Sequence, residues 1–181
     1  VSLTDDALKR RKVAVIDTTA GAEGLELLSP AHYLRQALAP NADLITGTIH
    51  DVLLASPDVI ILADIAKVAE TDALLDWIDE GGLLVRFAGP HLAASDALRD
   101  GTDPLLPVRL RAGGRSVGGT LSWGEAKAIA PFPESSPFHG LAVPADVSVR
   151  AQVLAQPDPE LATATIAALA DGTPLVTQKR V

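Results

Sequence analysis

Short, almost entirely apolar runs occur three times in the first half of the chain, at residues 12–17, 59–63 and 83–87. Runs of this length, rich in valine, isoleucine and leucine, are typical of strands buried on both faces of a parallel sheet. The segment 44–49 alternates between apolar and polar residues and predicts a further, weaker strand. The pattern therefore predicts four strands before residue 90.

Amphipathic helices are predicted between these strands. One begins at Ser29-Pro30, because serine is a good N-cap and proline suits the first helical position, and it ends at Pro40. Another covers about residues 70–80 and ends at Gly81-Gly82. Its apolar stripe, at i, i+3 and i+4, consists of Leu74, Trp77 and Ile78. Strands joined by helices imply right-handed crossovers, so we expect an α/β fold with a parallel sheet and helices on both faces.

The second half of the chain has a different sequence pattern, in which short apolar runs are separated by proline and glycine. Gly113-Gly114 reads as turn material, the tract 130–139 is predicted to be irregular, and Asp171-Gly172 is a good hairpin turn. The segment 160–169 fits either a helix or a strand. Antiparallel strands are predicted at residues 108–111, 120–123, 147–154, 165–169 and 175–177.

These observations suggest a single domain over residues 1–181. Its α/β part covers about residues 12–92, and its β-rich part covers about residues 104–181. The chain begins with Val1, contains no methionine and stops inside what looks like a strand or its exit. We therefore expect that the natural protein continues at both ends.

Composition narrows the function classes. The chain has 15 basic and 23 acidic residues, a net charge of −8, and only one short basic run at residues 9–12. A field of this sign repels phosphate backbones, which argues against nucleic acid as a partner. The absence of cysteine excludes disulfides, thiolate catalysis and cysteine metal sites. No apolar run approaches the roughly 20 residues that span a bilayer.

Two segments match functional motifs, but the residues around them do not fit the structures that those motifs require. Residues 114–118 satisfy G-x-S-x-G around Ser116, but a nucleophile elbow requires an apolar strand before the serine and a helix after it. The flanks favour a glycine-rich hairpin. Residues 21–24 lack the glycine spacing of a phosphate-binding turn, and Glu23 and Glu26 would repel an anion. The four histidines show no ligand spacing, so neither a metal nor a cofactor is expected.

Three polar residues are predicted to meet where ligands bind open α/β sheets. Asp17 and Asp64 end two of the apolar runs, and His91 follows the turn after the run at 83–87. The carboxyl ends of parallel strands lie at one edge of the sheet, where such folds place their ligands. Asp17, Asp64 and His91 thus form a candidate cleft. Carboxylates at strand ends also commonly cap loops, and a general acid–base role requires hydrogen-bonding reach.

Several segments carry a family resemblance: VIILAD at 59–64, LLDWIDEGGLLVRFAGPHLA at 74–93, APFPESSPFHGL at 130–141 and LADGTPLV at 169–176. They resemble the middle region of large alphaproteobacterial membrane proteins that carry an N-terminal double-transmembrane region related to aerotolerance regulators. The resemblance covers roughly residues 12–177. That region is similar to class I glutamine amidotransferases, so the resemblance implies a flavodoxin-like layout. It also implies a further strand after Arg180.

The resemblance does not carry over glutamine hydrolysis. Amidotransferases use a cysteine at a strand–helix turn, with a histidine and a glutamate further along. The matching turn here, around Gly89-Pro90-His91, has no cysteine, and no late His-x-Glu pair is present. The resemblance implies a non-catalytic, amidotransferase-like module that binds a ligand or a protein within a membrane-anchored cell-envelope protein. Its partners would be another protein or other domains of the parent chain, and segments outside this sequence would anchor the protein in the membrane.

Two alternatives stay open. One is a hydrolase-type enzyme that uses the strand-end carboxylates and His91. The other is a structural spacer between the membrane and a downstream domain. An open cleft around Asp17, Asp64 and His91 favours a ligand site or an enzyme. An exposed apolar patch elsewhere favours a protein partner.

Overall fold

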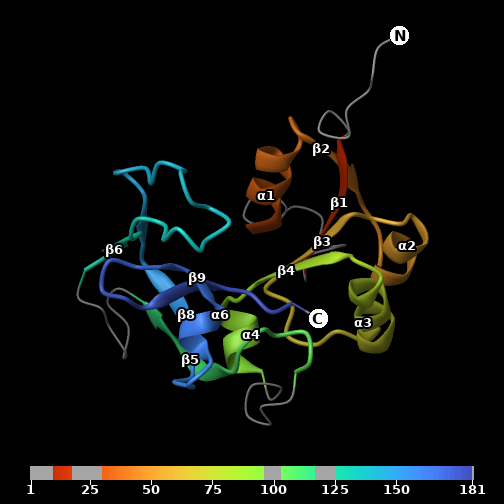
Figure 1. Ribbon diagram of the computed structural model, residues 1–181. Coiled ribbons are helices and arrows are strands. Elements are labelled where there is room, and N and C mark those ends of the chain that lie inside the picture. Colours follow the sequence, from red (N-terminus) through yellow and green to blue (C-terminus); the bar gives the residue numbers. More distant parts are fainter. Residues whose placement is uncertain (1–9, 18–29, 96–102, 117–124, 181) are drawn as a thin grey trace. The chain divides into compact units, whose positions relative to one another are not determined.

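A computed structural model describes residues 10–17, 30–95, 103–116 and 125–180 of the chain (Figure 1). The chain divides into two compact units, Val1–Phe87 and Ala88–Val181. Each unit has its own sheets. Among the described residues, no helix combines the length and the apolar character that crossing a bilayer requires.

The first unit is built on a parallel sheet of four strands. These are β1 (Arg11–Asp17), β2 (Ala42–Ile45), β3 (Val59–Ala63) and β4 (Leu83–Phe87). Their order in the sheet is β2-β1-β3-β4, and every pair is parallel. The predicted parallel sheet is confirmed, and β3 and β4 have the predicted boundaries.

Three helices connect these strands: α1 (Pro30–Leu38), α2 (Ile49–Leu54) and α3 (Thr71–Asp79). Because β2 and β3 lie on opposite sides of β1, right-handed crossovers place α1 on one face of the sheet and α2 on the other. The step from β3 to β4 crosses the sheet in the same direction as the step from β2 to β3. A right-handed crossover therefore places α3 on the same face as α2. Figure 1 shows α1 on one side of the sheet and α2 and α3 on the other. The unit is therefore mixed α/β, as predicted.

Helix α2 was not predicted, and the predicted strand 44–49 is wrong in its second half. The helix begins with a capping box. The Thr48 hydroxyl accepts a hydrogen bond from the Asp51 N–H at 3.3 Å, and the Asp51 carboxylate accepts one from the Thr48 N–H at 3.2 Å. These bonds satisfy two backbone donors at the start of a helix. They favour a helix start at Ile49 and end β2 at Ile45.

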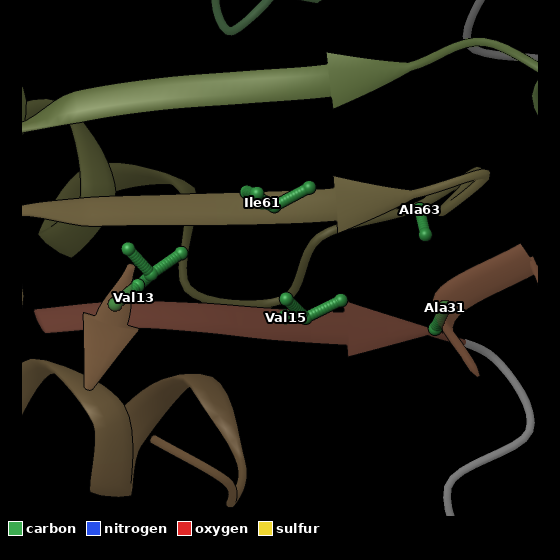
Figure 2. Packing of buried hydrophobic residues seen from close by; sticks show 6 residues of the cluster. Val13, Val15, Ala31, Ile61 and Ala63 are labelled. Carbon is green, nitrogen blue, oxygen red and sulfur yellow. The ribbon is translucent and has the colours of Figure 1, made fainter. Parts of the chain in front are cut away.

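One layer of the core of the first unit lies between the sheet and α1. Val13 and Val15 of β1 and Ile61 and Ala63 of β3 point to the same face, because residues in register share a face of a parallel sheet. Ala31 of α1 packs against them (Figure 2) and is fully buried. The opposite face contributes the fully buried Ile60 and Leu62. Burial on both faces explains why β3 is apolar throughout.

The second unit contains short antiparallel pairs of strands. Its elements are α4 (Pro90–Ala94), β5 (Leu110–Ser116), β6 (Lys127–Ala128), β7 (Ser148–Val149), β8 (Ala151–Ala155), α6 (Leu161–Ala164), β9 (Thr165–Ala168) and β10 (Pro174–Thr177). Strand β5 pairs with β8, β6 with β7, and β9 with β10. The predicted antiparallel, β-rich character is confirmed. The tract 130–139 is irregular, as predicted.

The turns and short strands of the second unit agree with the sequence predictions at some positions and differ at others. The hairpin around Asp171-Gly172 is confirmed: Gly172 has φ +82°, and the Thr173 N–H donates to the Asp171 carboxylate at 3.0 Å. The ambiguous segment 160–169 is a helical turn followed by a strand. The prediction of a turn at Gly113-Gly114 is wrong, because both glycines lie within β5. The pairing of β5 with β8 shifts register between Leu110 and Gly114, and glycine accommodates such an irregularity. The predicted strand 120–123 lies outside the described residues.

Candidate functional site

Parallel pairing brings two of the predicted site residues to one edge of the sheet. Asp17 is the last residue of β1 and lies opposite Ala63, the last residue of β3. Asp64 follows Ala63 directly, so Asp17 and Asp64 end neighbouring strands at the carboxyl edge. This is the edge at which open α/β sheets bind ligands.

The Asp17 carboxylate is buried and paired with a residue that the sequence did not point to. Asp17 is only 8% exposed, and its Oδ2 lies 3.9 Å from Nη1 of Arg35 in α1. The second guanidinium nitrogen of Arg35 donates to the Val15 carbonyl oxygen at 3.2 Å. A carboxylate that leaves water needs a partner of opposite charge or hydrogen-bond donors, and Arg35 supplies the opposite charge. The guanidinium therefore holds the end of β1 against α1.

A sequence signal for Arg35 exists in retrospect. Arg35 lies four residues after Ala31, so the two share one face of α1, and Ala31 is fully buried against the sheet. A long cationic side chain on the core-facing side of a helix needs an anionic partner at the edge of that core. Asp17, at the end of the first strand, is such a partner.

Asp64 has a backbone conformation that side chains rarely adopt. Its φ is +56°, in the left-handed region, which glycine adopts readily and asparagine and aspartate adopt more often than other residues. Its N–H donates to the Phe87 carbonyl oxygen at 2.9 Å. One residue later, the Ile65 carbonyl oxygen accepts from Nη2 of Arg86 at 2.8 Å. The two bonds from β4 hold the main chain at Asp64 and at Ile65.

His91 lies in the second unit. It is the second residue of α4, a helix of five residues that begins at Pro90 after Gly89 as N-cap, and its side chain is exposed. Asp17 and Asp64 belong to the first unit, so a crevice shared by all three residues stays a prediction.

The G-x-S-x-G motif does not have the setting of a nucleophile elbow. Ser116 ends β5, where it pairs with Ala151 of β8 in an antiparallel ladder, so it does not lie on a turn after a parallel strand. The predicted loop 21–24 lies outside the described residues. Within residues 10–17, 30–95, 103–116 and 125–180, no group of three or more histidine, aspartate or glutamate side chains is placed to hold a metal ion.

The carboxyl edge of the first unit thus carries two carboxylates, the buried one of Asp17 paired with the Arg35 guanidinium and the partly exposed one of Asp64. A carboxylate accepts hydrogen bonds from hydroxyl, amino and amide groups, which is the chemistry that Asp64 could contribute at this edge. Comparisons of the chain with known proteins found no matching family model, no matching curated protein and no matching solved structure.

Proposed function

We propose that the protein is a non-catalytic binding module that takes a small polar ligand at the carboxyl edge of its parallel sheet. The observation that carries this proposal is the left-handed conformation of Asp64 at the end of a central strand. Strained backbone that the surroundings impose is concentrated at functional sites. Aspartate is among the few residues other than glycine that tolerate this conformation, and at this position it places a carboxylate at the edge where open α/β sheets bind ligands.

We further propose that the fold is flavodoxin-like and of the class I glutamine amidotransferase type. The order β2-β1-β3-β4 agrees with the first four strands of the flavodoxin order 2-1-3-4-5. The turn between β4 and α4 consists of Ala88 and Gly89. An amidotransferase would carry its cysteine around this turn, and neither residue can attack a carbonyl group. The absence of a nucleophile at this turn supports a binding role for the module. We propose the membrane-anchored cell-envelope protein as its setting on the family resemblance alone.

A ligand screen on matched variants tests the proposal. Sugars, nucleosides and amino acids are added to the full chain, and backbone amide shifts are followed by NMR. We expect a ligand that shifts the amides of Asp17 and Asp64 and that binds at least about tenfold more weakly to Asp64→Asn, as expected for loss of a charged hydrogen-bond acceptor. Asparagine tolerates the left-handed region, so Asp64→Asn removes charge and not conformation. Asp72→Asn, at an exposed position of α3, is the control.

The other outcomes separate the alternatives. If the natural chain hydrolyses a model ester or phosphate ester, both Asp64→Asn and His91→Ala are then assayed. Loss of that activity in both variants would overturn the non-catalytic proposal in favour of a hydrolase. If no ligand in the screen shifts the carboxyl edge, or if Asp64→Asn binds as the natural chain does, the ligand site is refuted. A protein-binding or spacer role would then be the better account.

A further inference from the structure

A groove lies at the opposite, amino edge of the first unit. It has a volume of about 610 Å³ and is formed where β1, β3 and β4 begin and where α2 and α3 end. This volume is within the roughly 300–1,000 Å³ range of small-ligand sites. The groove is independent of the carboxyl edge considered above, because it lies at the other end of the strands.

One wall of the groove is apolar and rigidly held. The indole N–H of Trp77 donates to the Pro57 carbonyl oxygen at 3.2 Å. The backbone of Gly82 lies directly against the ring, so a Cβ there would come within 2.2 Å of Cε2 of Trp77. Leu83, which also lines the groove, is 57% exposed although it begins a strand. The wall therefore presents a fixed aromatic ring and an uncovered leucine.

The charge at the end of α3 has the wrong sign for a helix C-terminus. The last carbonyl groups of a helix carry a partial negative charge, which a lysine, arginine or histidine usually offsets. Helix α3 has no basic residue in its last turn, and its C-cap is Glu80. In the part of the chain that the structure describes, the Glu80 carboxylate makes no ion pair or hydrogen bond. The groove thus contains negative charge that the protein leaves unbalanced.

The basic residues near the groove are already engaged. Nη1 of Arg11 lies 3.4 Å from Oδ1 of Asp58. The ammonium group of Lys12 donates to the Ala55 carbonyl oxygen at the end of α2, at 3.1 Å. These contacts offset the charge at the end of α2 and at Asp58, and they leave Glu80 and the end of α3 without a counter-ion.

We propose that this groove binds a lysine or arginine side chain from a basic segment of a partner protein. Trp77 and Glu80 are three residues apart and share one face of α3. The aliphatic stem of the guest side chain lies along Trp77 and Leu83, and its charge lies beside Glu80 and the last carbonyls of α3. An aromatic ring with a carboxylate beside it is favourable for an organic cation. The net charge of −8 steers a basic partner toward the protein.

The test uses arginine and its neutral isostere. N-acetyl-arginine amide and N-acetyl-citrulline amide are titrated into the full chain, and the indole N–H resonance of Trp77 is followed by NMR, assigned with Trp77→Phe. We expect saturable shifts with the arginine compound and not with the citrulline compound. Glu80→Gln should weaken binding about threefold to fivefold, as expected for loss of one solvent-accessible ion pair.

A neighbouring acidic residue provides the control. Asp79 is exposed, lies next to Glu80 and does not line the groove, so Asp79→Asn should leave the affinity unchanged. Equal weakening by Asp79→Asn would mean that only the general negative charge attracts arginine. That result, equal binding of citrulline, or the absence of a saturable shift would overturn the proposal. Each outcome is distinct from those of the ligand screen, because the reporting residues lie at the other edge of the sheet.

Discussion

Gly82 and the ring of Trp77 are packed so closely that no side chain fits between them. A Cβ on Gly82 would lie 2.2 Å from Cε2 of Trp77 and 2.4 Å from Cδ2. Gly82 is not among the glycines with positive φ, so alanine at this position would cause no backbone strain. Its only cost would be the clash with the ring. We expect Gly82→Ala to lower the free energy of unfolding by about 1–3 kcal/mol, the usual cost of overpacking, measured by urea denaturation.

A double-mutant cycle isolates the role of the ring. Trp77→Leu removes the indole, so Gly82→Ala should cost much less in that background than in the natural chain. An equal cost in both backgrounds would show that the ring is not the cause.

Leu74 of α3 is predicted to be the most sensitive position of its helix. Its side chain is fully buried, and Leu→Ala substitutions at such sites cost about 2–5 kcal/mol because a cavity remains. Leu54, at the end of α2, is 74% exposed and provides the control. Leu54→Ala should change the free energy of unfolding by less than about 0.5 kcal/mol. Similar losses in the two variants would contradict the placement of α3 on the sheet.

The strongest elements of the first unit could be predicted because their signals are local. The run at Val59–Ala63 lies between Asp58 and Asp64, which mark its two ends. Because the strand is buried on both faces, it contains no polar residues, and its boundaries are clear in the sequence. Helix α2 could not be found in the same way. It has only six residues, too few for a helical period, and its start signal pairs Thr48 with aspartate where the usual capping box has glutamate or glutamine.

The candidate site was predictable only as far as topology fixes it. Parallel strands end at one edge, which was enough to bring Asp17 and Asp64 together. The pairing of Asp17 with Arg35 depends on the rotation of α1, and the left-handed conformation of Asp64 depends on bonds from β4. Neither relationship is encoded in residues that are close along the chain.

Ser56 offers a substitution that should stabilise the protein. It follows the C-cap of α2 with φ +50°, and its N–H donates to the Leu53 carbonyl oxygen at 3.0 Å. Glycine keeps this hydrogen bond and removes the left-handed penalty of roughly 1–2 kcal/mol, while its own flexibility costs about 0.5–1 kcal/mol. We expect Ser56→Gly to raise the free energy of unfolding by about 0.5 kcal/mol.

The matched variant is Ser56→Val, since a β-branched residue is least tolerant of the left-handed region. It should lower the free energy of unfolding, measured in the same denaturation series. If valine and glycine have the same effect, the backbone at residue 56 does not have the conformation described.

The capping box of α2 should make the protein sensitive to acid. The Thr48 hydroxyl, which donates to the Asp51 carboxylate at 2.7 Å, and then the Thr48 N–H lower the pKa of Asp51 from its ordinary value of 3.8. A carboxyl whose pKa is lower in the folded state stabilises the protein above the unfolded pKa. That contribution is lost as the pH falls through the folded pKa. We therefore expect the stability difference between the natural chain and Asp51→Asn to be largest near neutral pH and to shrink below about pH 4.

Carboxyl-detected NMR titration supplies the direct measurement. The pKa of Asp51 should lie below 3.8 in the natural chain and rise toward that value in Thr48→Ala, which removes the hydroxyl donor. Thr48→Ser keeps the hydroxyl and should keep the pKa low. A stability difference that is flat with pH, or the same pKa of Asp51 in Thr48→Ala and Thr48→Ser, would show that the hydroxyl does not hold the carboxylate. The start of α2 would then depend on the backbone bonds alone.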